Sequence, residues 1–247
     1  MRIAFAASRN LSVEIIKWIY NNKNQFDIQM VGGVAPKFKC WWDDKVEETY
    51  KNLQIPIYSS IEEMIDDSKP EIVFSLNYWR KISSEYISKV DMGIVNIHHS
   101  YKLRFRGRYS TSWAIIHARK DNNWIHGTTL HYVDSELDNG FIIDSKKCEI
   151  KESDTAEILF ERVEKLAIDM FKNNFNKILS GEQNFIDPDS EFFYYGKDSN
   201  NNLQINFNNS IEEVYDFVRA WSFKDRPKPY FLFNGRKIIL DLNKVNH

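Results

Sequence analysis

Short apolar runs alternate with amphipathic segments through the first part of the chain. Residues 2–7, RIAFAA, form an apolar run of strand length, and residues 11–22 repeat apolar side chains at helical spacing. The pattern predicts strands at 2–7, 28–34, 71–76 and 93–99, with helices near 43–53 and 59–67. Strands that alternate with helices favour parallel pairing. We therefore predict an α/β fold, a mainly parallel twisted sheet with helices on both faces and a Rossmann-like core.

Two strands and a long helix are expected in the next part of the chain. Residues 128–133 and 141–150 read as a strand pair joined by the loop DSELDNG. Asp154, with Glu157 three residues later, is expected to cap a helix whose apolar positions repeat as far as Ile178. This helix would cover the sheet.

The pattern changes after Gly181, where the sequence becomes polar and aromatic. A capped helix at 210–221 and a hairpin that turns at Asn234–Gly235 are predicted beyond it. We therefore divide the chain near residue 185, into an N-terminal domain at 1–185 and a small C-terminal helix and β-hairpin subdomain at 186–247.

Composition narrows the classes of function. The 33 Lys and Arg against 35 Asp and Glu give a net charge of −2, so we expect no nucleic-acid partner and no attraction to an anionic membrane. The apolar run at the start is far too short for a membrane span. Cys40 and Cys148 have no paired spacing, which favours a reducing cytoplasm, and the spacing of the histidines predicts no metal site.

A dense polar cluster ends the strand at 93–99. The stretch VNIHHSYKLRFRG places Asn96 and His98 on one strand face, because side chains alternate with a period of two. Ligands of parallel α/β sheets bind at the carboxyl ends of the strands. Taken alone, the pair could also be satisfied buried polar groups. Arg106 and Gly107 follow closely and make the loop rich in donors.

The loop DSELDNG brings carboxylates into the same region. Asp134, Glu136 and Asp138 lie in this loop, between strands that we expect to be neighbours. A carboxylate beside a histidine can orient the imidazole and raise its pKa, and an asparagine amide can donate to a developing oxyanion. These three roles suit acyl transfer to an amine.

Three linked motifs resemble one family. NIHHSYKLRFRG, HGTTLHYVDSELDNG and RAWSFKDRPKPYF are similar to the 10-formyltetrahydrofolate-dependent formyltransferases, whose pattern runs Asn-x-His-x-Ser, Arg-Gly, Gly-x-Thr and Leu-Asp-x-Gly. The order and spacing agree over residues 70–150. Within the family the chain looks most like the sugar N-formyltransferases, which combine this core with a short C-terminal helix and hairpin.

The resemblance implies a catalytic set at Asn96, His98 and Asp138. His98 would be the general base and proton shuttle, and Asn96 would stabilise the carbonyl oxygen as it gains charge. Asp138 would hold His98 or accept an amine proton. His99 lies off that strand face and is not the match. The implied cosubstrate is N10-formyltetrahydrofolate.

The folate site implied by the resemblance lies along the strand end before the catalytic strand and against the acidic loop. It comprises Tyr78, Trp79, Ile82, Val133, Asp134 and Leu137. Leu103 stands where the family commonly has a proline, which could alter the substrate loop. Trp41 and Trp42 match no family feature, and a lid, a base-stacking surface and core packing stay open for them.

Other residues are candidates for binding the acceptor substrate. Arg9 and Arg106 could pair with a pyrophosphate, or could be solvated surface arginines. The aromatic side chains of Tyr109, Phe223 and Tyr230 could stack on a base or pack in a core. The predicted substrate-binding residues are Ser8, Arg9, Ser100, Arg106, Tyr109 and Tyr230. No phosphate-binding glycine motif follows the first strand, which disfavours a dinucleotide site.

We predict formyl transfer to the amine of a dTDP-linked amino-dideoxy sugar, with dTDP-4-amino-4,6-dideoxy-D-glucose as the first choice, for O-antigen or other lipopolysaccharide synthesis. The net charge of −2 disfavours a methionyl-tRNA formyltransferase, and a glycinamide ribonucleotide formyltransferase would leave 186–247 unexplained. A non-catalytic folate- or sugar-nucleotide-binding module is the alternative from another class. The aromatic, partly apolar C-terminal segment predicts a homodimer.

Overall fold

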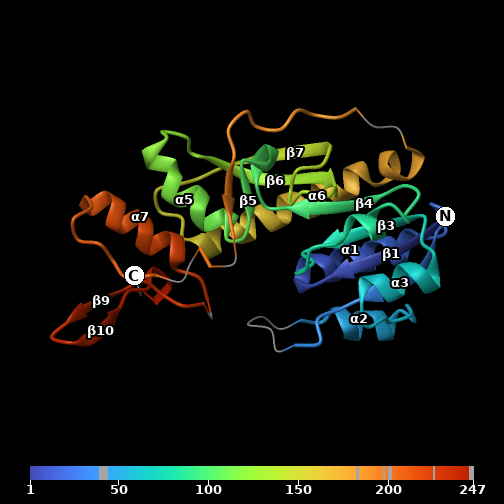
Figure 1. The fold of residues 1–247 in the computed structure, drawn as a ribbon, viewed down its shortest axis with the longest axis horizontal. Helices are drawn as coiled ribbons and strands as arrows, with labels where there is room; N and C mark the ends of the chain where they lie inside the picture. Colours follow the sequence, from blue (N-terminus) through green and yellow to red (C-terminus); the bar gives the residue numbers. More distant parts are fainter. Residues whose placement is uncertain (39–43, 182–183, 197, 200–201, 225, 245–247) are drawn as a thin grey trace.

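The computed structural model describes residues 1–247 except 39–43, 182–183, 197, 200–201, 225 and 245–247. Its centre is a six-stranded sheet in the order β2-β1-β3-β4-β6-β7 (Figure 1). The strands are β1 (Arg2–Ala7), β2 (Gln29–Val34), β3 (Ile72–Leu76), β4 (Ile94–His98), β6 (Ile125–Tyr132) and β7 (Ile142–Glu149). The pairs among β1 to β4 are parallel, whereas β6 runs antiparallel to both β4 and β7. The predicted mainly parallel α/β fold is confirmed.

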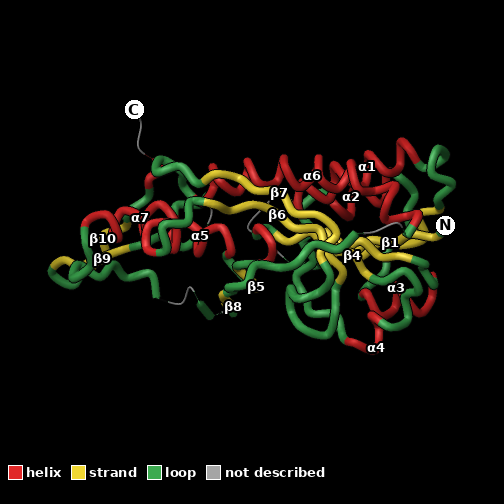
Figure 2. Tube along the Cα trace, turned by 90° about the horizontal axis from the view of Figure 1, so that it is seen from above, coloured by secondary structure: helices red, strands yellow, loops and turns green. Residues whose placement is uncertain are grey.

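Helices cover both faces of the sheet (Figure 2). The elements on one face are α1 (Arg9–Asn22), α2 (Val46–Asn52) and α6 (Ala156–Ser180), and those on the other are α3 (Ile61–Ser68) and the short α4 (Ser84–Ile87). Alternation along the strands produces this arrangement. Phe5 joins the core beneath α1 and α6, whereas Ala4 and Ala6 join the core beneath α3.

The same alternation directs successive side chains at the end of β4 to opposite faces of the sheet. Ile94 belongs to the core beneath α3, and Val95 and Ile97 belong to the core beneath α6. Asn96 and His98 follow the parity of Ile94 and therefore share one face of the strand. The sheet thus presents both side chains to the same side of its carboxyl edge.

A third hydrophobic core lies beyond the end of the sheet. There α5 (Ser110–Lys120), α7 (Ile211–Trp221) and the first turns of α6 pack together. The short strand β5 (Phe105–Gly107) pairs in parallel with β8 (Phe193–Tyr195), a pairing that the sequence pattern did not predict. This pairing carries a late segment of the chain to the edge of the functional site. The division near residue 185 stays a prediction.

The predicted C-terminal hairpin is confirmed. β9 (Tyr230–Phe233) and β10 (Arg236–Ile239) are antiparallel, and the turn residues Asn234 and Gly235 have φ of 49° and 74°. Tight hairpin turns need positive φ at both central residues, which explains the Asn-Gly pair. Two short 3₁₀ helices complete the described elements, η1 at Tyr101–Leu103 and η2 at Leu242–Lys244.

Ser60 caps α3, and Ser210 caps the predicted capped helix α7, but the predicted cap of α6 is wrong. Thr155 is the cap residue of α6, and its hydroxyl accepts a hydrogen bond from the Ile158 N–H. The Asp154 carboxylate instead accepts from the Lys151 N–H and pairs with Arg162. Asp154 therefore ties the preceding turn to the helix rather than capping it.

Some expectations concern residues that the structure describes only in part. Cys148 is buried and in no disulfide. Cys40, Trp41 and Trp42 lie outside the described residues. In the described ranges, no helix combines the length and apolar character needed to cross a membrane.

Candidate active site

A cleft of about 950 Å³ opens at the carboxyl ends of β1, β3 and β4. The predicted site residues that line it are Ser8, Arg9, Tyr78, Trp79, Asn96, His98, Tyr109, Leu137 and Asp138. They come from the ends of these strands, from the start of α5 and from the loop between β6 and β7. Within the described residues, no group of three or more His, Cys, Asp or Glu side chains is arranged to hold a metal ion.

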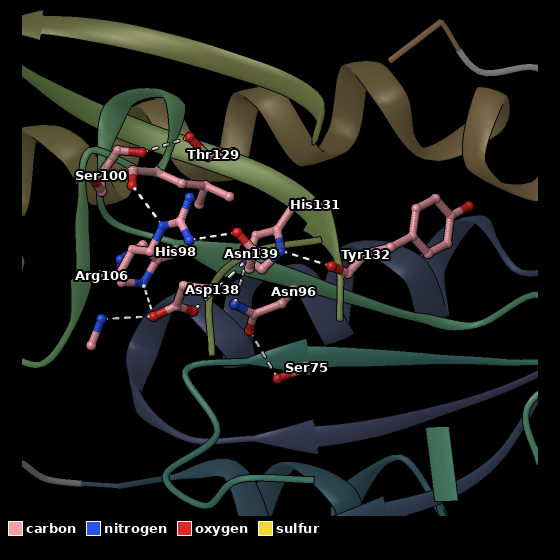
Figure 3. Close-up of polar contacts among 12 residues, drawn as sticks. Ser75, Asn96, His98, Ser100, Arg106, Thr129, His131, Tyr132, Asp138 and Asn139 are labelled. Carbon is pink, nitrogen blue, oxygen red and sulfur yellow. Dashed lines mark hydrogen bonds and ion pairs between the residues drawn. The ribbon is translucent and has the colours of Figure 1, made fainter. Parts of the chain in front are cut away.

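Two neighbours hold the Asn96 amide in one orientation (Figure 3). The Ser75 hydroxyl donates to Asn96 Oδ1 at 2.9 Å, and Asn96 Nδ2 lies 3.0 Å from His131 Nε2. His131 Nδ1 lies 2.8 Å from the Tyr132 carbonyl oxygen, which can only accept, so the ring proton is on Nδ1. Nε2 therefore accepts from the amide. The second hydrogen of Asn96 Nδ2 remains for an oxygen atom in the cleft.

His131 is a site residue that the sequence interpretation missed. Burial outweighs the nearby Asp138 carboxylate and lowers the pKa of His131 to about 4, so the ring is neutral near pH 7. It consequently keeps the lone pair that receives the amide hydrogen. The antiparallel register of β4 and β6 sets His131 opposite Asn96. Only the register identifies His131 as a neighbour of Asn96, because the sequence alone does not say which residues of two strands face each other.

His98 presents one ring nitrogen toward Asp138. Its Nε2 lies 2.7 Å from the Phe105 carbonyl oxygen and must carry a proton, since a carbonyl only accepts. In the neutral ring the lone pair is on Nδ1, which lies 3.7 Å from Asp138 Oδ2. A proton taken up at Nδ1 would face the carboxylate. This is the arrangement of a general base beside a charge-stabilising acid.

The backbone of β5 fixes Asp138 from another side. The Gly107 N–H donates to Asp138 Oδ2 at 2.8 Å. Gly107 has a φ of +84°, and a Cβ atom there would lie 2.3 Å from the carbonyl oxygen of Tyr195 in β8. Glycine therefore lets β5 approach β8 and the carboxylate together. Asp138 itself has a φ of 50°, which is uncommon for a residue with a side chain and is maintained by these contacts.

Three predicted folate residues do not line the cleft. Ile82 is 4% exposed and packs in the core beneath α3. The Val133 N–H donates to the Ile94 carbonyl and so extends the sheet, and the Asp134 carboxylate accepts from the Glu136 N–H within the loop. These three residues lie outside the cleft lining, and their role in folate binding stays a prediction.

Three predicted substrate residues also lie outside the lining of the cleft. Ser100 is fully buried, and its hydroxyl accepts from the Phe105 N–H. The Arg106 guanidinium is buried and donates to the Asn139 side chain, so it anchors the loop that carries Asp138 (Figure 3). Tyr230 belongs to the β9–β10 hairpin, where Lys237 lies over its ring. The structure gives these three residues contacts within the protein, and their role in substrate binding stays a prediction.

Aromatic faces and unpaired donors occur together after β3. Asn77 and Trp79 are among the residues that line the cleft. Asn77 Nδ2 and Trp79 Nε1 are buried and have no hydrogen-bond partner in the described part of the chain. The rings of Tyr78 and Trp79 are 4.7 Å apart, and burial raises the pKa of Tyr78 to about 12, so its hydroxyl stays neutral. A buried donor without a partner is costly, which indicates a ligand that carries acceptor atoms.

Two arginines line another part of the cleft, and the sequence interpretation identified only Arg9. The Arg9 guanidinium carbon lies 5.5 Å from the centre of the Phe160 ring, and that of Arg226 lies 4.0 Å from the centre of the Phe223 ring. Burial and the nearby Arg9 charge lower the pKa of Arg226 to about 9. Two like charges in one partly buried region can bind an anion together, although the Glu164 and Glu157 carboxylates also act on Arg9 and Arg226.

The chain belongs to the formyl transferase family, whose match spans residues 6–173. It is 30% identical over 180 residues to the bifunctional polymyxin resistance protein ArnA of Wigglesworthia glossinidia brevipalpis, which covers 72% of this chain and 27% of that protein. It is 26% identical over 196 residues to the methionyl-tRNA formyltransferase of Malacoplasma penetrans. This alignment covers 79% of this chain and 60% of that protein. The chain therefore spans less than two thirds of the length of either relative.

Solved structures extend the likeness over nearly the whole chain. WlaRD, a sugar 3N-formyl transferase studied in the presence of dTDP and 5-N-formyl-THF, has a TM-score of 0.79 at 25% identity, over 97% of this chain and 85% of its own. A sugar N-formyltransferase from a Shewanella species has a TM-score of 0.81 at 21% identity, over 98% of this chain and 97% of its own. The expected family and its fold are confirmed.

Proposed function

We propose that the chain transfers the formyl group of N10-formyltetrahydrofolate to the amine of a dTDP-linked amino-dideoxy sugar. The convergence of Asn96, His98 and Asp138 on one cleft carries this proposal, because their surroundings already set the amide orientation and the ring tautomer. Such pre-set groups cost no reorganisation when charge develops in the transition state.

The residues after β3 fit the folate. The pterin ring of a folate carries nitrogen and oxygen acceptors, and the buried donors of Asn77 and Trp79 lack partners in the described chain. The rings of Tyr78 and Trp79 offer apolar surface beside these donors. Bound there, N10-formyltetrahydrofolate would supply the formyl carbon.

In the proposed reaction, His98 Nδ1 carries a proton from the sugar amine to the folate nitrogen. The neutral sugar amine bonds to the formyl carbon, and the spare Asn96 N–H stabilises the oxygen as it gains charge. His98 Nδ1 takes the proton that the amine nitrogen loses, while Asp138 stabilises the imidazolium. The bond between the formyl carbon and the folate nitrogen breaks, and His98 returns the proton to that nitrogen.

A nucleotide-linked acceptor is supported by the charges in the cleft. Arg9 and Arg226 suit the two negative phosphates of a nucleoside diphosphate. WlaRD, the sugar 3N-formyl transferase at 25% identity, was studied with dTDP, which supports a dTDP sugar here. We keep dTDP-4-amino-4,6-dideoxyglucose as the first acceptor to test, with its 3-amino isomers beside it. The product would serve O-antigen or other lipopolysaccharide synthesis in the cytoplasm.

We expect dTDP to raise the melting temperature of the protein more than UDP, GDP or CMP at equal concentration, since only a bound nucleotide stabilises the native state. With N10-formyltetrahydrofolate, mass spectrometry should then detect an N-formylated dTDP-4-amino or dTDP-3-amino sugar. The 4-amino and 3-amino sugars are assayed separately, and the sugar that is formylated shows which amine accepts the formyl group. No turnover of either sugar, together with no stabilisation by dTDP, would contradict the proposal.

The methionyl-tRNA formyltransferases among the relatives favour a second acceptor, the amine of a charged tRNA. A net charge of −2 opposes this candidate, because tRNA binding needs positive charge to neutralise phosphates. Adding charged initiator tRNA as a third acceptor separates the two. Formyl-methionine released from that tRNA, without a sugar product, would support the second candidate.

We further propose a homodimer formed through the C-terminal hairpin. Leu232, Phe233 and Ile239 are 54%, 64% and 61% exposed on β9 and β10, which is unusual for three large apolar side chains in one small sheet. Burial against a second copy would remove them from water. Sedimentation velocity at micromolar concentration should give a dimer, and a Phe233→Glu variant should be a monomer; a monomeric unmodified chain would overturn this.

A further inference from the structure

His99 is a buried histidine in the cleft that the proposed chemistry does not use. It follows β4 and points to the side opposite His98, where its ring lies 4.9 Å from the Phe160 ring of α6 at an interplanar angle of 27°. The side chain is 6% exposed, and His99 is among the residues that line the cleft. It therefore belongs to the wall of the cleft rather than to the general core.

Neither ring nitrogen of His99 has a hydrogen-bond partner in the described part of the chain. Burial, and next the Arg9 charge, lower the pKa of His99 well below its ordinary value, so the ring is neutral. A neutral imidazole has one N–H donor and one acceptor, and both are unused here. Packing on Phe160 alone would be served better by a phenylalanine, which has nothing to desolvate.

The surroundings of His99 suit an anion. Arg9 and His99 lie against the same Phe160 ring, and Phe160 contacts Phe223 at 5.4 Å between ring centres. Phe223 in turn lies beneath the Arg226 guanidinium. Two cations and one neutral imidazole are thus placed along a pair of touching rings in one wall of the cleft.

We propose that His99 is a substrate-positioning residue whose imidazole N–H donates to a phosphate oxygen of the sugar nucleotide held by Arg9 and Arg226. This inference rests on the proposed function. Both ring nitrogens are buried without a hydrogen-bond partner among the described residues, and the Arg9 and Arg226 guanidiniums lie against the neighbouring Phe160 and Phe223 rings. Without a ligand, the unpaired imidazole of His99 lowers the stability of the folded chain. Nucleotide binding supplies its missing hydrogen bond, so the residue that strengthens binding also destabilises the free protein.

The test compares His99→Phe with the unmodified chain by calorimetric titration of dTDP and of thymidine. His99→Phe keeps the ring on Phe160 and removes both nitrogens. We expect it to bind dTDP about tenfold more weakly or worse, because one hydrogen bond to a charged group is lost, and to bind thymidine unchanged. In turnover assays KM for the sugar nucleotide should rise by a similar factor, with kcat changed less than about threefold.

Two further variants separate positioning from structure. His99→Gln retains a donor and should recover part of the dTDP affinity. His126→Phe is the matched control, because His126 is 1% exposed with a neutral ring but does not line the cleft. It should bind dTDP as the unmodified chain does. The melting temperature of His99→Phe should equal or exceed that of the unmodified chain, which a merely structural residue would not give.

The outcomes distinguish this inference from the proposed function. Equal dTDP affinity of His99→Phe and the unmodified chain would overturn the positioning role alone. A variant that melts earlier and loses dTDP and thymidine equally would assign His99 to packing and would overturn the role as well. An unmodified chain that binds none of dTDP, UDP and GDP would overturn the proposed nucleotide-sugar substrate itself.

Discussion

His98→Ala is expected to lower kcat/KM for formyl transfer about a thousandfold, with little change in the affinity for dTDP. His98 Nδ1 is the nitrogen that carries the lone pair, because Nε2 donates to the Phe105 carbonyl. Without it the amine proton has no acceptor beside Asp138, and proton transfer by a positioned base is worth about 10²- to 10⁴-fold. Initial rates of N-formylated product, measured by mass spectrometry, give the value.

Binding and folding controls make this result specific to proton transfer. The melting temperature of His98→Ala, with and without dTDP, should show the same stabilisation by the nucleotide as in the unmodified chain. His98→Gln is a useful partner variant, since it can donate to the Phe105 carbonyl yet cannot accept a proton at neutral pH. Activity of His98→Ala within tenfold of the unmodified chain would remove His98 from the proton path.

Gly107→Ala is expected to reduce both the stability of the protein and its activity. The new Cβ would lie 2.3 Å from the Tyr195 carbonyl oxygen, so β5 must move away from β8. The Gly107 N–H would then leave Asp138, and we expect kcat/KM to fall about a hundredfold, as for other lost supports of a catalytic acid. Urea denaturation should give a free energy of unfolding lower by about 2 to 4 kcal/mol.

Gly181→Ala is the matched control for this substitution. Gly181 has a φ of +72°, close to the +84° of Gly107, but a Cβ atom there would meet no atom of the described residues within 4 Å. It carries the backbone cost of alanine at positive φ, about 1 kcal/mol, without the collision. Equal destabilisation by the two substitutions, or unchanged activity of Gly107→Ala, would mean that β8 does not support Asp138.

Period-two alternation was enough to pair Asn96 with His98, because both lie within β4. Alternation gives no information about Ser100, since β4 ends at His98 and the chain turns into η1, where strand parity no longer applies. Leu103 in η1 has a φ of 58°, a conformation that the ring of proline excludes. The absence of the usual family proline therefore coincides with a loop that proline could not form.

Residues that act through long-range pairing could not be found from local patterns. His131 supports Asn96 only because β4 and β6 share one particular register. Arg226 reaches the cleft from beyond α7, and no spacing rule connects it with Arg9 near the start of the chain. The linked motifs predict a catalytic triad by resemblance, whereas the groups that support these three side chains depend on tertiary packing.

The pairing of β5 with β8 has a consequence for the order in which the enzyme is made. Asn96, His98 and Asp138 all leave the ribosome before residues 193–195, which form β8. Until that segment emerges, β5 lacks its strand partner, and the Gly107 N–H that donates to Asp138 lacks the support of β8. The nascent chain thus carries all three proposed catalytic residues before it contains β8, so the strand that supports the Gly107 contact to Asp138 is translated well after them.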